Sequence, residues 1–268
     1  MVDSKDFILS SKFLELRLGS KDCLLVNFTF AENTGPIALP GSELFRITIN
    51  NQPYSAADLL FAGGSFLPTA NGVSHFAAFF DGPGFRVVQN FIIYPDSILL
   101  ETWPVVHNTG SSEIHITRVD SYSFDLSRAE YGLLSFVSDW GKEFEPNFHP
   151  LSSQTSIETR FGHSSKGAHP WFALSRQGMV ISGSVAWSGN WICRFEPLAG
   201  GAWRACGGLN DWNFAKDLHP GAAAEFPHCT LAFGGDLNAV SRQFAEIGRK
   251  YWYPHTSLSD SLPVEWNH

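Results

Sequence analysis

Leu14-Glu15-Leu16-Arg17-Leu18 alternates leucine with charged residues, and the polar turn Gly19-Ser20-Lys21-Asp22 separates it from the apolar run Leu24–Phe30. Successive side chains of a strand point to opposite faces, so this alternation gives one apolar and one polar face. Two such runs joined by a short polar turn are typical of a half-buried β-hairpin. The stretch therefore predicts antiparallel β-structure.

Similar runs recur along most of the chain between turn-forming residues. They are Phe45–Ile49, Ile98–Val106, Glu113–Asp120, Ser156–Phe161, Trp171–Leu174, Met179–Trp187, Trp191–Phe195 and His228–Phe233. Many short strands with turns at short intervals indicate an antiparallel sandwich. We therefore predict a mainly β fold that forms one large antiparallel domain.

The composition indicates a large covered surface. Of the 268 residues, 44% are hydrophobic and 14% aromatic, whereas only 16% are charged. Charged residues make up about 25% of average domains, so much of this chain must lie in its own core or against a partner. The cysteines are widely spaced and fit unpaired buried thiols: Cys23, Cys193, Cys206 and Cys229.

The charge balance and the N-terminal sequence exclude several partners. The net charge is −8 and no basic cluster is longer than Arg249-Lys250, so no nucleic acid partner is expected. No apolar run approaches the roughly 18 to 20 residues of a spanning helix, so no membrane partner is expected either. Polar residues 10–12 occupy the place where a signal peptide needs apolar ones. A cytoplasmic location is the resulting expectation.

The periodicity changes near the end of the chain. Apolar residues recur three and four positions apart at Leu237, Val240, Phe244, Ile247 and Tyr251, with Asp236 at the N-cap. This predicts one amphipathic linking α-helix of about four turns. We expect a β-domain at residues 1–234, the helix at 235–253, and at 254–268 a linker that ends in the start of an unfinished further domain.

The densest polar and aromatic stretch lies at residues 138–150 and lacks periodicity. It holds the carboxylates Asp139, Glu143 and Glu145. Two carboxylates roughly 5 to 10 Å apart across a sugar bond would form a glycosidase site. A long solvated connection between sheets has the same composition, and we favour this structural interpretation.

Two further stretches carry candidate side chains. His163 and His169 stand six residues apart, which excludes the helical zinc arrangement but allows a general base; a histidine bonded to backbone is the alternative. Trp187 and Trp191 flank the turn Ser188-Gly189-Asn190. These rings either stack on sugar faces or fill the core, and the core is the favoured place for each.

In this order, the three stretches resemble the N-terminal domain of α-galactosidases of glycoside hydrolase family 36. Asp139-Trp140-Gly141 and Pro150-Leu151 match a Gly- and Trp-containing segment and the Pro-Leu pair of the family. Residues 157–165 match an Ile-Glu-x-Arg-x-Gly-x-Ser-Ser segment, and His169–Leu174 follows it. Trp187–Trp191 matches an aromatic-Ser-Gly-Asn-aromatic turn. The resemblance is clearest over residues 100–252.

The resemblance implies a β-supersandwich of the galactose mutarotase type, followed by the linking helix and, in the family, by a (β/α)₈ catalytic barrel. The catalytic aspartates of the family lie in that barrel, so no catalytic residue, metal or cofactor is implied here; Val264–Asn267 is at most the first barrel strand. The implied partners are α-galactoside sugars, the barrel domain of the same polypeptide, and further copies in a homo-oligomer.

Four residues are the candidates for side chains that face sugar or the barrel: Trp140, His163, Lys166 and Trp191. We also expect an exposed apolar patch beside the terminal helix, where the barrel would lie. Two other functions stay open. One is an aldose-epimerase-like enzyme that opens sugar rings with a histidine and a carboxylate, and the other is a carbohydrate-binding module without chemistry.

Overall fold

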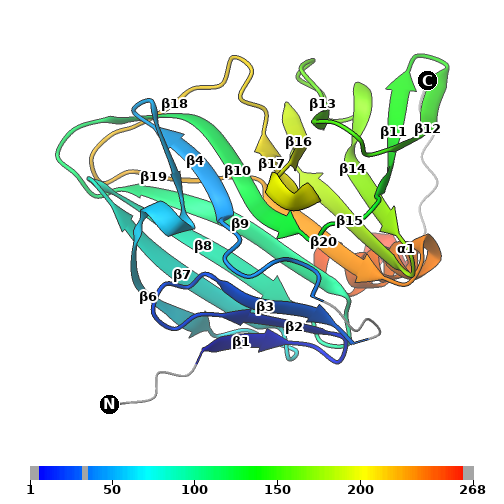
Figure 1. Cartoon of the computed structure of the whole chain (residues 1–268), viewed down its shortest axis with the longest axis horizontal. Coiled ribbons are helices and arrows are strands. Elements are labelled where there is room, and N and C mark those ends of the chain that lie inside the picture. The colour runs from blue at the N-terminus through cyan, green and yellow to red at the C-terminus, as the bar shows by residue number, and fades with distance from the viewer. Residues whose placement is uncertain (1–5, 32–35, 262–268) are drawn as a thin grey trace.

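The computed structural model describes residues 6–31 and 36–261, and these form two large antiparallel sheets that lie face to face (Figure 1). The seven-stranded sheet has the order β13 (Thr155–Glu158), β16 (Trp191–Pro197), β17 (Trp203–Leu209), β10 (Ile114–Leu126), β4 (Leu44–Ile49) and β5 (Gln52–Ser55), with β18 (Lys216–Leu218) beside β10. The ten-stranded sheet has the order β12 (Lys142–Pro150), β11 (Gly132–Asp139), β14 (Gly167–Arg176), β15 (Met179–Ala186), β20 (His228–Gly234), β9 (Leu99–Asn108), β8 (Phe85–Ile93), β7 (Ser74–Gly82) and β6 (Leu60–Leu67), with β19 (Ala223–Glu225) beside β9. The predicted antiparallel supersandwich is confirmed.

A third, smaller sheet contains the hairpin from which the fold was predicted. It consists of β1 (Phe7–Ser10), β2 (Leu14–Leu18) and β3 (Leu25–Phe30). All three leucines of β2 are buried, as the alternation predicts. Phe28 of β3 meets Phe233 of β20 edge-on, with ring centroids 4.8 Å apart, and Phe124 of β10 at 6.0 Å. The small sheet therefore packs against both large sheets.

Aromatic rings fill the space between the large sheets. Phe45 of β4 lies 5.4 Å from Phe80 of β7, and Phe172 of β14 lies 4.9 Å from Phe195 of β16, both edge-on. All four rings are buried. Edge-on pairs add about 0.5–1.5 kcal/mol each to the burial of their area. The high aromatic content thus serves the core of the sandwich.

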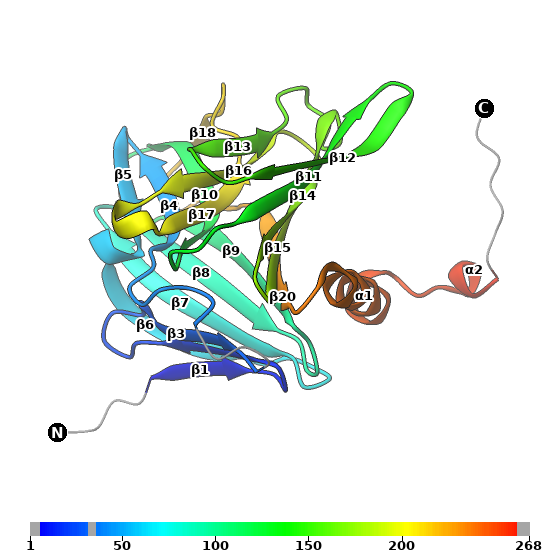
Figure 2. The same cartoon turned by 45° about the vertical axis from the view of Figure 1, so that its right-hand side comes forward.

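The predicted helix begins as expected and ends differently. In α1 (Leu237–Ile247), the side chain of Asp236 caps the first turn by accepting the N–H of Ala239 at 2.7 Å. The helix lies beside β15 and β20 (Figure 2). The last predicted turn is instead a wider π-type turn, η3 (Gly248–Trp252), followed by a one-turn helix, α2 (Ser257–Asp260), within the expected linker.

The C-terminal part of the chain carries the predicted apolar surface and the predicted first barrel strand. Exposed apolar side chains occur at and after α1, namely Leu237, Trp252, Tyr253 and Leu258. The expected barrel strand at Val264–Asn267 lies outside the described residues.

Two short 3₁₀ turns complete the fold, η1 (Ala56–Asp58) and η2 (Ala199–Gly201). Within residues 6–31 and 36–261, no helix has the length and apolar character needed to cross a membrane.

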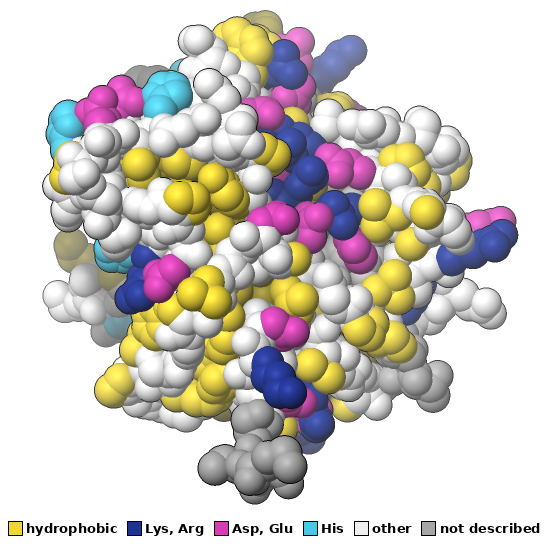
Figure 3. All heavy atoms as spheres, turned by 60° about the vertical axis from the view of Figure 1, so that its left-hand side comes forward, with side chains coloured by type: hydrophobic (Ala, Val, Ile, Leu, Met, Phe, Trp, Pro, Cys, Tyr) yellow, Lys and Arg dark blue, Asp and Glu magenta, His cyan; other side chains and the backbone are white. Residues whose placement is uncertain are grey.

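The outer face of the seven-stranded sheet carries a network of ion pairs. Asp120 is fully buried at its centre and accepts bonds of 2.7 Å from Arg118 and Arg194. The network comprises Arg46, Arg118, Arg194, Arg204, Glu43, Asp120, Asp125, Glu196 and Asp211. In Figure 3, acidic and basic side chains likewise lie next to one another rather than in patches of one sign.

Candidate functional site

The stretch at residues 138–150 forms the end of a β-hairpin. β11 ends at Asp139, Trp140-Gly141 make the turn, and β12 begins at Lys142. Gly141 has a φ of +71°, which glycine adopts without strain. The expected solvated connection between sheets is therefore wrong. β12 is an edge strand exposed along almost all its length, so neither of its faces shows the apolar alternation that identifies a strand.

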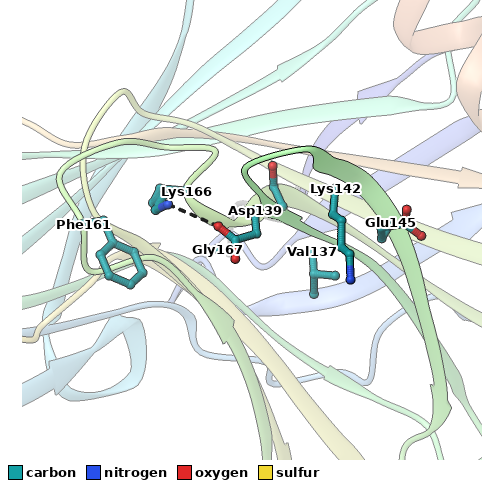
Figure 4. Close-up of a pocket in the computed structure, with 8 residues that line it drawn as sticks. Val137, Asp139, Lys142, Glu145, Phe161, Lys166 and Gly167 are labelled. Atoms are coloured by element: carbon teal, nitrogen blue, oxygen red, sulfur yellow. Dashed lines mark hydrogen bonds and ion pairs between the residues drawn. The ribbon is translucent and has the colours of Figure 1, made fainter.

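A cleft lies between the end of this hairpin and the loop at residues 159–166, which we call the tip loop. The cleft has two hollows of about 480 and 490 Å³, and Ser138, Asp139 and Lys166 line both. In the first hollow, Lys166 Nζ points toward Asp139 Oδ1 at 3.5 Å, with Phe161 on the loop side and Val137 on the hairpin side (Figure 4). We call the two hollows together the tip cleft.

Asp139 is held in its ionised form. The backbone N–H of Trp140 donates to its Oδ1 at 2.8 Å, and Lys166 lies near the same oxygen. The bond from Trp140, followed by the charge of Lys166, lowers the pKa of Asp139 below its ordinary value. A general acid of glycoside hydrolysis needs a raised pKa. Asp139 is therefore suited to accept a hydrogen bond from a hydroxyl, not to donate a proton.

The second hollow brings together three of the four predicted site residues. Trp140, His163 and Lys166 line it. Trp140 is 92% exposed, and His163 and Lys166 are exposed as well. An aromatic face beside several hydrogen-bonding groups is an arrangement that can bind a small polar molecule such as a sugar.

His169 also lines this hollow and has an unusual environment. Its ring lies 4.2 Å from that of Phe144, and its Nε2 is buried without a hydrogen-bond partner. Burial lowers the pKa of His169, and the charge of Glu143 only partly opposes this. The neutral imidazole is therefore favoured near neutral pH.

Trp191 is the exception among the four predicted residues. Its side chain is 0% exposed and lies on the inner side of β16 with Phe195. The indole Nε1–H donates to the carbonyl oxygen of Ser164 at 2.7 Å. The prediction that Trp191 faces sugar or a barrel is therefore wrong, and the alternative, a core position, is correct. Trp187, at the other end of the turn, is exposed, so the core position favoured for it is wrong.

A second polar cluster lies on the outer face of the ten-stranded sheet. His228 Nδ1 is 2.6 Å from Glu101 Oε1, His228 Nε2 is 3.4 Å from Glu225 Oε1, and the ring stacks on Trp103 at 3.8 Å. Tyr94 Oη donates to the other oxygen of Glu101. Burial alone would lower the pKa of His228, but the bonds and charges of the two glutamates raise it. The cluster leaves no local signal in the sequence, because Glu101 and His228 lie in strands 127 positions apart.

The described part of the chain offers no donor set for a metal. Among residues 6–31 and 36–261, no group of three or more His, Cys, Asp or Glu side chains is placed to hold an ion. The four cysteines are free and buried. Burial raises the pKa of the Cys193 thiol to about 12, which disfavours the thiolate that metal binding requires.

Comparison with known sequences points to one family. The profile of the glycosyl hydrolase family 36 N-terminal domain matches residues 82–219. Alpha-galactosidase AgaA of Geobacillus stearothermophilus is 28% identical over 163 residues, which cover 56% of this chain and 22% of that protein. Alpha-galactosidase 2 of Hypocrea jecorina is 25% identical over 170 residues, 60% of this chain and 23% of that protein. The chain thus matches less than a quarter of each of these relatives.

Solved structures share the fold. A variant of the Geobacillus stearothermophilus enzyme AgaA in complex with raffinose superposes with a TM-score of 0.80 at 19% identity, over 96% of this chain and 44% of that chain. A galactose mutarotase-like protein from Lactobacillus casei gives 0.50 at 11% identity, over 85% of this chain and 99% of that chain. Because the family profile matches more than half of the sequence, the chain belongs to the family of glycosyl hydrolase family 36 N-terminal domains.

Proposed function

We propose that this chain acts as the non-catalytic N-terminal domain of an α-galactosidase-like glycoside hydrolase. The family match over residues 82–219, together with relatives named α-galactosidases of which it covers less than a quarter, carries the proposal. Retaining glycosidases use two carboxylates about 5 Å apart, one attacking the anomeric carbon and one protonating the leaving oxygen. We assign this pair to a (β/α)₈ barrel of the same polypeptide, reached through residues 235–253 and 254–268.

In this proposal, the tip cleft contacts the α-galactoside. Trp140 presents its ring to solvent, Lys166 can donate to a sugar hydroxyl, and the ionised Asp139 can accept from one. Each hollow falls within the roughly 300–1,000 Å³ of small-molecule sites. Related enzymes have been solved with raffinose and stachyose, which makes these sugars the first ligands to test.

Contacts with further copies of the chain and a cytoplasmic location are also part of the proposal. The contacts between copies rest on the family resemblance and on the low charged fraction, which favours covered surface. Sedimentation analysis and fractionation of the source cells would test them.

The test of this function combines binding with catalysis. Titration with raffinose, followed by tryptophan fluorescence, should show binding, whereas the chain alone should release no p-nitrophenol from p-nitrophenyl α-D-galactopyranoside. Trp140→Ala should weaken raffinose binding about three- to tenfold, the value of one aromatic contact. Trp187→Ala, which removes another exposed tryptophan that lines neither hollow of the tip cleft, is the matched control. Two results would overturn the proposal: hydrolysis of the substrate by the chain alone, or an affinity for raffinose that is the same in Trp140→Ala as in the wild type.

Aldose-epimerase-like activity is a second candidate, favoured by the contact of Glu101 with His228 on a sheet face. A neighbouring imidazole and carboxylate can transfer the protons that open and close a sugar ring. Polarimetry of fresh α-D-galactose measures this directly. Acceleration by the chain that disappears in His228→Gln would support the candidate, and no acceleration at high protein concentration would remove it.

A further inference from the structure

The tip loop is bonded to the neighbouring turn at two points. The indole Nε1–H of Trp191 donates to the carbonyl oxygen of Ser164 at 2.7 Å. The backbone N–H of Gly162 donates to Asn190 Oδ1, also at 2.7 Å. Asn190 and Trp191 are consecutive, and Gly162 and Ser164 flank His163. One short segment therefore holds the tip loop on both sides of His163.

A buried hydroxyl draws the ends of the same loop together. Thr159 Oγ1 lies 2.8 Å from the carbonyl oxygen of Lys166 and 3.1 Å from that of His163. The backbone N–H of Thr159 donates to the carbonyl oxygen of Trp191 at 3.1 Å. Nδ2 of Asn210 donates to the carbonyl oxygen of Thr159, also at 3.1 Å. Because Thr159, Trp191 and Asn210 are buried, these bonds tie the loop to the core of the seven-stranded sheet.

The side chains that line the tip cleft lack such support. His163 is exposed, and Lys166 meets Asp139 in a 3.5 Å ion pair whose members are at least half exposed, an interaction that constrains little. We propose that Trp191 and Asn190 are positioning residues, which fix the backbone of the tip loop so that His163 and Lys166 line the cleft. Their effect on sugar binding rests on the proposed function, whereas their effect on the loop does not.

The chemistry explains why a tryptophan stands at position 191. Its ring fills the core while its N–H reaches the loop backbone. Phenylalanine would keep most of the packing but leave the carbonyl oxygen of Ser164 without this donor. A buried acceptor that loses its donor is left unsatisfied, so the loop backbone is held less firmly. A shift of about 1 Å in a binding group can weaken a site strongly.

The test removes the donor and keeps a ring. In Trp191→Phe, we expect amide hydrogen exchange in the tip loop to become about tenfold faster, the effect of one net hydrogen bond. The pKa of Asp139, followed by carboxyl carbon NMR, should rise by part of its shift as Lys166 moves away, while the bond from Trp140 keeps it below its ordinary value. Trp187→Phe is the matched control, because Trp187 is exposed at the other end of the same turn. It should change neither quantity.

Asn190→Ala keeps the proposal testable if Trp191→Phe does not fold, because Asn190 is only half-buried and the core ring stays in place. Unchanged exchange in the tip loop of the folded variants would overturn the proposal. Raffinose binding is a separate arm, in which Trp191→Phe should bind more weakly than Trp187→Phe. If the wild type binds no raffinose while loop exchange still rises in Trp191→Phe, the proposed function fails and the positioning role stands.

Discussion

Gly183 gives a direct test of how the two large sheets pack. It lies in β15 directly opposite Phe172 of β14, and a methyl group there would lie 2.3 Å from Phe172 Cε1 and 2.5 Å from Cζ. Phe172 is fully buried and meets Phe195 of the other sheet at 4.9 Å. Gly183→Ala must therefore push the ring of Phe172 toward Phe195 or force the sheets apart.

The size of the effect follows from the position of the strand. β15 is paired on both sides, with β14 and β20, so its backbone cannot move away from the ring without breaking pairs. Overpacking of this kind costs about 1–3 kcal/mol. We expect the free energy of unfolding, measured in urea, to fall by about 2 kcal/mol, and the Tm, measured by calorimetry, to fall by about 4–8 °C. Ser184→Ala, on the opposite face of the same strand, is the matched control and should change stability by less than about 0.5 kcal/mol.

A second substitution shows whether the clash is the cause. Phe172→Leu removes ring atoms and should by itself cost about 1–2 kcal/mol through the space it leaves. The double variant should lose less stability than the sum of the two single losses, by about 1 kcal/mol or more. Strictly additive losses, or Gly183→Ala as stable as the wild type, would show that the ring does not cover residue 183 and would refute the packing argument.

Three further predictions concern buried or partly buried charges and thiols. Asp120→Asn should lower the free energy of unfolding by about 3–5 kcal/mol in urea, because buried Arg194 loses its buried counter-charge. The pKa of His228 is raised in the folded state, so its stabilising contribution is complete below the ordinary value of 6.5 and is lost as pH rises through the folded pKa. The Tm advantage of the wild type over His228→Gln should therefore shrink on going from acidic to alkaline pH; a pH-independent difference would contradict this. The four cysteines, which are buried, should not react with Ellman's reagent until the protein is unfolded, and rapid labelling of native protein would count against the described core.

The fold was predictable at several strands with one buried and one more exposed face, although β8, whose burial alternates over its first residues, was not among the predicted runs. In β2, burial follows the alternation of Leu14-Glu15-Leu16-Arg17-Leu18 residue by residue. The edge strands β6 and β12 were missed because both of their faces meet water along much of their length. Periodicity reports a difference between two faces, so a strand whose faces share one environment leaves no such signal.

The site was only partly predictable, because tryptophan suits both a core and a sugar surface. Trp140 and Trp191 both stand at glycine-containing turns, yet one is almost fully exposed and the other fully buried. The partner that distinguishes them, the carbonyl oxygen of Ser164, lies 27 positions from Trp191 and is brought near it by the tip loop. The contact of Glu101 with His228 depends in the same way on strand register, which local composition does not encode.

Two kinds of surface differ in what lies beside their charged side chains. On the outer face of the seven-stranded sheet, charged side chains neutralise one another in the ion-pair network. The hairpin and the tip loop also expose charges, such as Lys142 and Glu143, but beside them they expose aromatic rings, at Trp140, Phe144, Phe148 and Phe161. Grouped exposed rings mark binding surfaces, and here Lys166 and Asp139 add groups that bond hydroxyls. At and after α1, exposed apolar side chains such as Leu237 and Leu258 stand among exposed charged ones such as Arg242 and Arg249. We therefore expect sugar at the tip cleft and a protein partner, such as the proposed barrel, beside the helix.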